Sequence, residues 1–349
     1  MYTREIQAPQ GTPIEKGKPL QGTWISAFNE VDLLNIHRPF SIPLPRWMRD
    51  YRIKEWNTFI INDDDFFFEA MLANMKYYRM AQVYVYDKKT KELLHFRKVI
   101  PFNGWRLPRD LYNSSIISRS YGFFFRIHNW LYANTIKIDL DITATRNRPS
   151  FTAHLEYDLD RNRTTPMAVN VPFSERRCMY AYKVLAAVRG EMVFGGRHIS
   201  LDPDRTMGLF EDFKGFFPYR MHAVWCTGLG FDAENRRFGF SIAENQTKET
   251  NKNNENALWV EGRLTPLPPV RITMPAGLDK EWVIQDIEGM VDLTFTPQVP
   301  RRTAFNILVT SAEYDTPLGH FNGALVTSEG KKIPVRNMWG LGEKLYLRV

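Results

Sequence analysis

Cysteine is scarce in this sequence: only Cys178 and Cys226 occur among 349 residues. Two cysteines exclude a disulfide framework and a cysteine-based zinc site, since each of these needs more thiols. One bridge between the two remains an alternative. We expect two free, buried thiols instead, because an isolated cysteine commonly packs as a small apolar side chain.

Long apolar runs are also missing. No run of about 18 apolar residues is present, the length at which a helix becomes a candidate to span a membrane. The first 20 residues carry early charges and three prolines, with no apolar centre, which is unlike a signal peptide. We therefore expect a cytoplasmic protein without a transmembrane segment.

Motifs of metal, phosphate and nucleophilic chemistry are absent. No serine lies in a G-x-S-x-G elbow, and neither cysteine belongs to a recognised motif of a catalytic cysteine. The glycines of "GLGEKLYLRV" lack the Lys-Ser/Thr ending of a phosphate loop. Seven histidines occur without HxH or HExxH spacing, at His37, His95, His128, His154, His198, His222 and His320. We expect no metal and no cofactor.

The charge pattern has no strongly basic run. The net charge is +7, from 46 basic and 39 acidic residues. No basic run carries interleaved aromatic residues. The basic pairs are far apart in the sequence, at Arg176-Arg177, Arg236-Arg237, Arg301-Arg302 and Lys331-Lys332. This pattern is typical of a solvated surface, so we expect no nucleic-acid partner.

Aromatic residues and two-residue alternation are abundant. The chain has 24 Phe, 15 Tyr and 9 Trp, which favour strands. In "TIKIDLDI" (residues 135–142) apolar residues alternate with Lys137, Asp139 and Asp141, as in a strand with one buried face. Similar short segments follow one another with polar turns between them, and only "MYAYKVLAAVRG" (residues 179–190) approaches a helical pattern. The sequence therefore predicts an all-β sandwich or barrel.

Two polar segments interrupt the strands. "RNRTTPM" (residues 161–167) ends a run of strands, and we place a domain boundary there. "NQTKETNKNNEN" (residues 245–256) is long for a hairpin connection. Its asparagines and threonines can cap the loop's own backbone. The alternative places Glu255 or Asn256 at the mouth of a barrel, beside the polar end of a ligand.

The segment "GFFPYRMHAVW" (residues 215–225) has the densest mixture of aromatic and ionisable residues. On a strand, Tyr219, Met221, Ala223 and Trp225 share one face, and His222 lies on the other. An apolar pocket beside a histidine would suit a general acid. The alternative is a core face and a solvent face.

Several motifs together resemble the bacterial domain-of-unknown-function family 2804: "LQGTW" (20–24), "DFKGFFPYRMHAVWCTGLG" (212–230), "NENALWVEGRL" (254–264), "VDLTFTP" (291–297) and "NMWGLGEKLYLRV" (337–349). That family is similar to proteins with two lipocalin domains, which include carotenoid hydratases and pericyclase-type cyclases. The resemblance implies an all-β fold with two lipocalin-like antiparallel β-barrel or half-barrel domains in tandem. We expect an N-terminal extension over 1–19 and domains over 20–165 and 166–349.

The resemblance is imperfect at two places. Relatives tend to carry Gly-Arg-Gly-x-Trp-Pro-Tyr, where this chain has "FKGFFPY" with Lys214 and Phe217. Relatives often have a His-Glu pair after the boundary proline, whereas Pro166 is followed by Met167 and Ala168. A catalytic role that depends on that acid is therefore in question.

The resemblance and the aromatic content together imply binding of a hydrophobic small molecule, such as a lipid or isoprenoid, in a barrel cavity. The expected ligand-binding residues are Phe217, Trp225, Asn256 and Trp339. An alternative is a cofactor-independent hydratase or cyclase that protonates an apolar unsaturated substrate, with Glu255, Glu343, Tyr219 and His222 as candidate catalytic residues. A structural or interaction protein without a ligand is the third possibility, and the sequence does not predict an oligomeric state.

Overall fold

A computed structural model describes residues 1–349 except 102–104, 161–162, 308–309 and 349. Nearly all regular structure in the described residues is antiparallel β-sheet, so the predicted all-β class is confirmed. Over the described residues the helical elements are α1 (Arg46–Arg52) and two 3-10 turns, η1 (Leu33–Asn35) and η2 (Leu131–Ala133). None of the described helices is both long and apolar enough to cross a membrane.

The first large sheet has 13 strands. Its strands are β3 (Gly22–Trp24), β4 (Lys54–Asn62), β5 (Phe66–Asn74), β6 (Tyr78–Asp87), β7 (Leu93–Pro101), β8 (Ser114–Ser120), β9 (Phe123–Trp130), β10 (Thr135–Ile142), β11 (Phe151–Asp158), β12 (Met167–Ser174), β13 (Arg177–Phe194), β14 (Arg197–Leu201) and β15 (Met207–Gly215). The main path runs β7-β6-β5-β4-β15-β13-β11-β10-β9-β8, while β12 and β14 pair with β13 and β3 pairs with β12.

The second large sheet has 11 strands. They are β16 (Arg220–Phe231), β17 (Arg237–Asn245), β18 (Ala257–Val260), β19 (Arg263–Pro266), β20 (Arg271–Thr273), β21 (Trp282–Gln285), β22 (Val291–Val299), β23 (Arg302–Ile307), β24 (Thr310–Asp315), β25 (Leu318–Val326) and β26 (Lys332–Arg348). Its path runs β19-β18-β17-β16-β26-β25-β22-β21-β20, and β24 joins β23 to β26. A separate small hairpin consists of β1 (Ile14–Glu15) and β2 (Lys18–Pro19).

The chain passes from the first sheet to the second between Gly215 and Arg220. Strand β15 pairs with β4, which lies more than a hundred residues earlier in the chain, and β16 pairs with the final strand β26. Residues 167–215, which we expected in the second domain, are hydrogen-bonded within the first sheet. The boundary expected near residue 165 thus lies inside the first sheet, and residues 161–162 of that segment lie outside the described residues.

Alternation determines which side chains each sheet buries. In β10 the apolar residues Ile136, Ile138, Leu140 and Ile142 are buried while Lys137 is exposed, as predicted. "MYAYKVLAAVRG" belongs to the long strand β13 and forms no helix, because it hydrogen-bonds to neighbouring strands on both sides.

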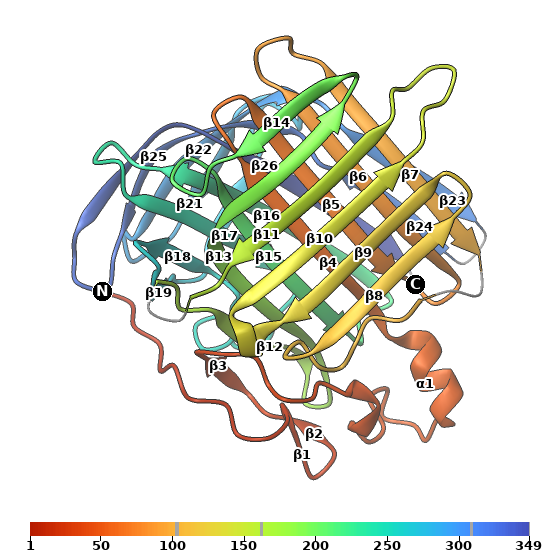
Figure 1. Ribbon diagram of the computed structural model, residues 1–349. Helices are drawn as coiled ribbons and strands as arrows, with labels where there is room; N and C mark the ends of the chain where they lie inside the picture. Colours follow the sequence, from red (N-terminus) through yellow and green to blue (C-terminus); the bar gives the residue numbers. More distant parts are fainter. Residues whose placement is uncertain (102–104, 161–162, 308–309, 349) are drawn as a thin grey trace.

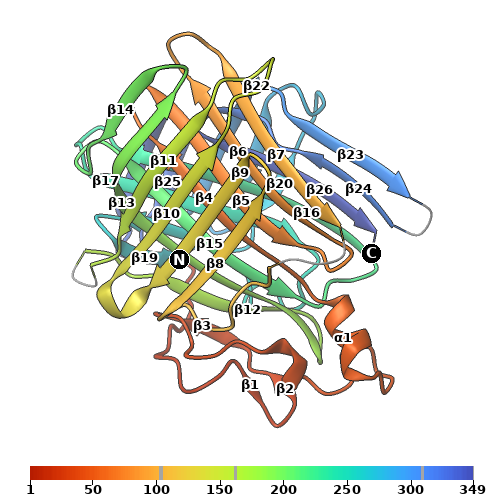
Figure 2. The same ribbon diagram turned by 45° about the vertical axis from the view of Figure 1, so that its right-hand side comes forward.

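Three apolar clusters form the interior. One lies within the first sheet and includes Phe125 and Phe151, and one lies within the second and includes Trp282. The third draws on both sheets, for example Ile60 from β4 and Leu341 from β26. Figures 1 and 2 show both sheets curling, with one behind the other. The third cluster therefore holds the two sheets together.

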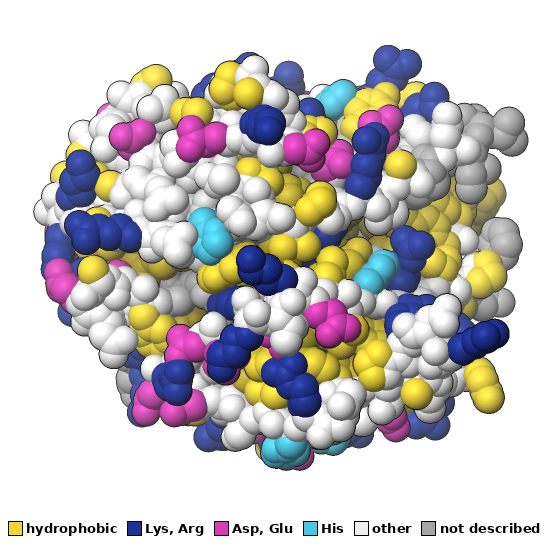
Figure 3. Space-filling model, turned by 90° about the horizontal axis from the view of Figure 1, so that it is seen from above, with side chains coloured by type: hydrophobic (Ala, Val, Ile, Leu, Met, Phe, Trp, Pro, Cys, Tyr) yellow, Lys and Arg dark blue, Asp and Glu magenta, His cyan; other side chains and the backbone are white. Residues whose placement is uncertain are grey.

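Both cysteines are free and buried, as expected. Burial raises the pKa of the Cys178 thiol to about 12 and also raises that of Cys226. On the face seen in Figure 3, basic and acidic side chains are interspersed, and apolar side chains lie in a hollow between them.

Candidate functional site

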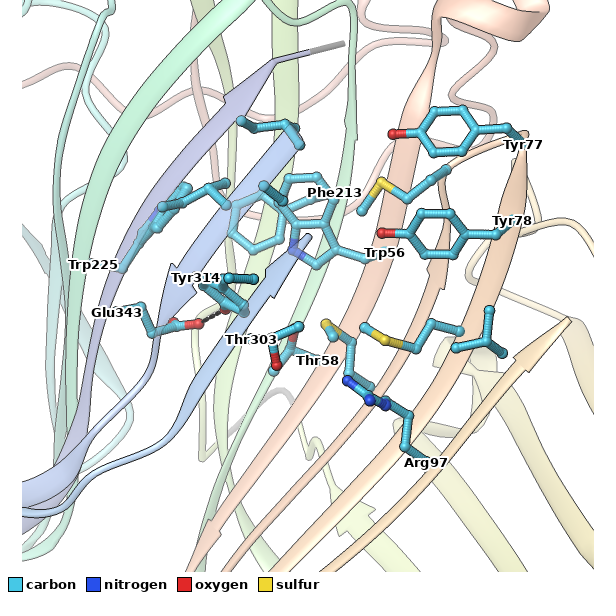
Figure 4. A pocket seen from close by; sticks show the side chains of 18 of the residues that line it. Trp56, Thr58, Tyr77, Tyr78, Arg97, Phe213, Trp225, Thr303, Tyr314 and Glu343 are labelled. Carbon is cyan, nitrogen blue, oxygen red and sulfur yellow. Dashed lines mark hydrogen bonds between the residues drawn. The ribbon is translucent and has the colours of Figure 1, made fainter. Parts of the chain in front are cut away.

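A cavity of about 670 Å³ lies between the two sheets. Strands β4 to β7 and β15 form one wall, and β16, β23, β24 and β26 form the other (Figure 4). Tyr51 of α1 also lines the cavity. The lining is Tyr51, Trp56, Thr58, Met71, Met75, Tyr77, Tyr78, Met80, Arg97, Val99, Glu211, Phe213, Trp225, Thr303, Ala304, Ala312, Tyr314, Glu343, Leu345 and Leu347. The space is thus bounded by both sheets, whereas we expected a cavity inside one barrel.

Two-residue alternation directs the lining residues into this space. On β4, Trp56 and Thr58 face the cavity while the intervening Asn57 contacts Asp212 of β15. On β26, Glu343, Leu345 and Leu347 face it in the same way. The cavity is therefore built mainly on strands, and of these only the edge strands β7 and β23 lack a partner on one side in the described residues.

Aromatic rings form a continuous apolar wall. Trp56 stacks on Phe213, with ring centroids 5.1 Å apart, and on Phe217 at 5.4 Å. Phe217 supports Trp56 from behind and is not itself a lining residue. Such rings offer a flat surface to an apolar ligand.

Glu343 is a carboxylic acid on the wall opposite Tyr77 and Tyr78 (Figure 4). Its side chain is almost fully buried, and its Oε1 accepts a hydrogen bond from the hydroxyl of Tyr314. Burial raises the pKa of Glu343 to about 8, and the nearby Glu69 carboxylate acts in the same direction. Glu343 therefore carries a proton at neutral pH.

An ion pair between the sheets lies close to Glu343. The guanidinium of Arg301 contacts the Glu69 carboxylate at 2.6 Å, and both side chains are buried. Arg301 also lies over the ring of Tyr84, 4.2 Å from its centroid, and its Nε donates to the Thr316 carbonyl at 2.6 Å. These contacts fix the charge of Arg301 away from the cavity lining.

A second buried network surrounds Lys183. Its Nζ lies 2.8 Å from Glu255 Oε2 and 3.5 Å from Glu211 Oε1, and it donates to Ser241 Oγ at 2.8 Å. Burial acts to lower the pKa of Lys183, but the two carboxylates outweigh it and the pKa is raised. Burial raises the pKa of Glu211 despite the neighbouring ammonium. Glu211 lines the cavity, so a second carboxyl group with a raised pKa faces the same space as Glu343.

The structure places Glu255 and Trp225 together. Trp225 lines the cavity, and its indole N–H donates to Glu255 Oε1 at 3.3 Å. Glu255 itself is fully buried behind Trp225 and is not a lining residue. Its other contacts are Lys183 and the Asn245 side chain, which donates at 2.8 Å. In this structure Glu255 holds Trp225 in position and has no access to the cavity.

Asn256 caps backbone groups in the polar corner. Its side-chain oxygen accepts from the amide of Ala243 at 2.7 Å, and its side-chain amide donates to the Pro268 carbonyl at 2.8 Å. Asn254 in turn accepts from the Asn256 backbone at 2.9 Å. The corner is a self-capped loop, and Asn256 does not line the cavity.

The remaining predicted residues also lie away from the cavity lining. Tyr219 is 49% exposed and precedes β16, where strand alternation does not yet apply. His222 is exposed and packs beside the ring of Tyr346, because it lies on the outward face of β16. Trp339 packs on His320 and Tyr86 instead of reaching the cavity. The predicted alternation within β16 is correct, since Met221, Ala223 and Trp225 are buried.

Sequence reasoning missed Glu211, Tyr314 and Lys183. The sequence does carry a signal for Glu211. In "MGLFEDFKG" it shares a strand face with Leu209 and Phe213, and a charged residue on an apolar face requires a buried partner. In the part of the chain that the structure describes, no group of three or more His, Cys, Asp or Glu side chains is arranged to hold a metal ion.

A protein-family model described as "Domain of unknown function (DUF2804)" matches residues 3–348. The chain belongs to this family. No curated protein sequence matches this DUF2804 chain.

Among solved structures, this DUF2804 chain is similar to CghA, with a TM-score of 0.51 and 12% identity over 84% of this chain and 87% of that one. It also matches kievitone hydratase from Nectria haematococca, with a TM-score of 0.49 and 13% identity over 84% and 88% of the two chains. The likeness to CghA shows a shared fold. The predicted family and the predicted tandem lipocalin-like half-barrels are confirmed.

Proposed function

We propose that this DUF2804 protein binds an apolar small molecule in the cavity between its two sheets. The observation that carries the proposal is the cavity itself, whose volume of about 670 Å³ is lined mainly by aromatic and aliphatic side chains. Ligand sites typically enclose about 300–1,000 Å³ and contain a few polar groups among apolar ones. A lipid or isoprenoid-like molecule fits this chemistry.

Glu343 supplies the polar contact deep in the cavity. Because Tyr314 donates to Oε1, a proton on Oε2 remains available to a hydrogen-bond acceptor of the ligand. A ligand with an apolar body and one carbonyl, hydroxyl or ether oxygen packs on the apolar lining and accepts a hydrogen bond from Glu343.

Native mass spectrometry of protein purified from its own host, together with titration of an apolar fluorescent dye, tests the proposal. We expect the same bound molecule in repeated preparations, and we expect this molecule to displace the dye from the protein. Ala312→Phe places a ring in the cavity and weakens dye binding by roughly tenfold or more, since overlap with the dye costs more than about 1.4 kcal/mol. Ile117→Phe, on the exposed face of β8, is the matched control and leaves dye binding unchanged. Protein without bound molecules and without dye uptake contradicts the proposal and favours a structural or interaction protein.

A second candidate function is acid catalysis on an unsaturated substrate, and the raised pKa of Glu343 favours it. The carboxyl O–H proton moves to an alkene carbon, and the alkene electron pair forms the new C–H bond. Addition of water to the resulting cation then releases a proton that returns to the carboxylate. Glu343 takes this role in place of Glu255, because Glu255 lies behind Trp225.

Turnover of an alkene and polyene panel separates binding from catalysis. Under the catalytic function, Glu343→Gln abolishes turnover and retains dye binding. Glu329→Gln, which changes an exposed glutamate, retains both. Absence of turnover by the unaltered protein on every substrate leaves ligand binding as the function.

A further inference from the structure

Exposed apolar side chains gather on and beside α1. Of the large apolar side chains that are exposed, four fall within ten residues: Ile42 at 54%, Trp47 at 71%, Met48 at 37% and Tyr51 at 51%. No residue of α1 is buried. Figures 1 and 2 show α1 at the lower right, projecting from the body of the sheets. Exposed apolar side chains that gather in one patch, with charged residues around them, mark a surface that contacts a partner or a membrane.

Trp47 and Tyr51 are four residues apart and therefore lie on one face of α1, with Met48 beside them. Arg49 of the same helix anchors it to the segment around η1. Arg49 donates to the carbonyls of Leu34 and Ile36 at 2.7 and 2.8 Å. The helix is thus held with its aromatic face outward.

Positive charge surrounds this face. Residues 38–53 contain four arginines and one acidic residue. Asp32 is shared by Arg46 at 3.3 Å and Arg109 at 2.9 Å. Asp50 is shared by Lys76 at 3.1 Å and Arg106 at 3.6 Å. Arg109 also pairs with Glu30 at 3.7 Å and Lys76 with Glu55 at 3.2 Å, so these two networks are balanced in charge. Arg46 and Arg106 nevertheless remain largely exposed. The positive excess of this surface comes from the other arginines of residues 38–53, namely Arg38, Arg49 and Arg52.

We propose that α1 with Ile42, Trp47, Met48 and Tyr51 docks on an anionic phospholipid surface. Tryptophan and tyrosine favour the membrane interface, where an apolar body and a polar edge are both satisfied. The arginines around them contact lipid phosphates, and each arginine raises the membrane partition coefficient by about fivefold. A seven-residue helix offers far less area than the roughly 800 Å² per partner of a stable protein interface, whereas insertion into a bilayer needs no matching surface.

The docking surface adjoins the mouth of the cavity. Tyr51 belongs to α1 and also lines the cavity, and another lining residue, Val99, is 50% exposed. A bilayer bound at α1 therefore faces the opening between the sheets. Docking stands on the exposed side chains and charges, and it does not require that the cavity bind a ligand.

Flotation of the full chain with phosphatidylcholine vesicles, with and without phosphatidylglycerol, tests the inference. We expect the unaltered protein to bind the anionic vesicles, and less so as salt rises. Trp47→Ser combined with Met48→Ser lowers the partition coefficient by about tenfold or more. Arg46→Gln combined with Arg106→Gln lowers it on anionic vesicles only.

The matched control is Tyr121→Ser combined with Tyr132→Ser, which removes two aromatic side chains exposed elsewhere on the first sheet and its connections. Its partition coefficient stays within about twofold of the unaltered protein. Circular dichroism and dye uptake without vesicles verify that the Trp47/Met48 variant is folded, since neither residue lines the cavity. Failure of the unaltered protein to bind anionic vesicles overturns the inference. That failure is the result expected if another protein, and not a membrane, covers α1. Undiminished binding by the Trp47/Met48 variant overturns it as well. Vesicle binding without any dye uptake upholds docking and contradicts the proposed ligand cavity.

Discussion

Replacement of Glu343 by glutamine changes how the stability of the protein depends on pH. The pKa of Glu343 is about 8 in the folded protein against an ordinary value of 4.5. Between these values the folded state holds a proton that the unfolded state has released. The free energy of unfolding therefore falls as pH rises through this window.

The magnitude follows from the shift. Each pKa unit corresponds to about 1.4 kcal/mol, so a difference of 8 minus 4.5 corresponds to about 5 kcal/mol across the window. Glutamine resembles the protonated acid in shape and still accepts the Tyr314 hydrogen bond. Glu343→Gln thus matches the unaltered protein in stability below about pH 4.5 and becomes the more stable of the two as pH approaches 8.

Urea unfolding at a series of pH values measures this difference. Subtraction of the two profiles removes the contribution of every other titrating group that the substitution does not affect. Glu329→Gln, at an exposed site, serves as the control and gives a difference that does not vary with pH. A constant difference for Glu343→Gln, or one in which the variant loses stability as pH rises, refutes the conclusion that Glu343 is protonated at neutral pH.

Three further predictions concern the framework around the cavity. Lys183→Met lowers the free energy of unfolding by about 3–5 kcal/mol, because it leaves buried carboxylates uncompensated. The control Lys137→Met, at a half-exposed site, changes the free energy of unfolding by under about 1 kcal/mol. Similar urea midpoints for the two variants contradict the prediction. Gly190→Ala lowers the thermal unfolding midpoint, since φ is +139° and a Cβ would lie 2.0 Å from a backbone carbonyl oxygen of the adjacent strand; an unchanged midpoint shows that the strands adapt. The thiols of Cys178 and Cys226 react with a thiol reagent only in denaturant, because both are buried with raised pKa values; rapid reaction of the native protein disproves this.

The sequence predicts individual strands well because alternation is a local property. In β10 the apolar residues are buried and the charged residues between them are exposed or half-buried, as the alternation in the sequence predicts. The same reasoning identifies the inward face of β16, which places Trp225 toward the cavity. Tyr219 lies just before that strand, so extending the alternation to it assigned the wrong face.

Pairing between distant strands is not a local property. Strand β15 joins β4 and strand β13 joins β11, and these pairings carry residues 167–215 into the first sheet. A polar segment such as "RNRTTPM" indicates a loop but not which sheet the following strand joins. The cavity residues combine strands from residue 56 to residue 347, so their proximity depends on pairings that no local pattern encodes.

The two buried ion pairs between the sheets explain how the cavity keeps its shape. Lys183 lies in the first sheet and Glu255 borders the second, while Glu69 lies in the first and Arg301 borders the second. Separation of the sheets would leave Glu255, Glu69 and Arg301 unpaired and Lys183 with Glu211 alone, at a cost of several kcal/mol per pair. Under the proposed function the sheets stay docked while a ligand enters, and the ligand passes beside α1, where the lining residues Tyr51 and Val99 are exposed. Docked sheets keep the Glu343 carboxylic acid protonated, because water admitted between separating sheets would return the pKa of Glu343 toward its ordinary value.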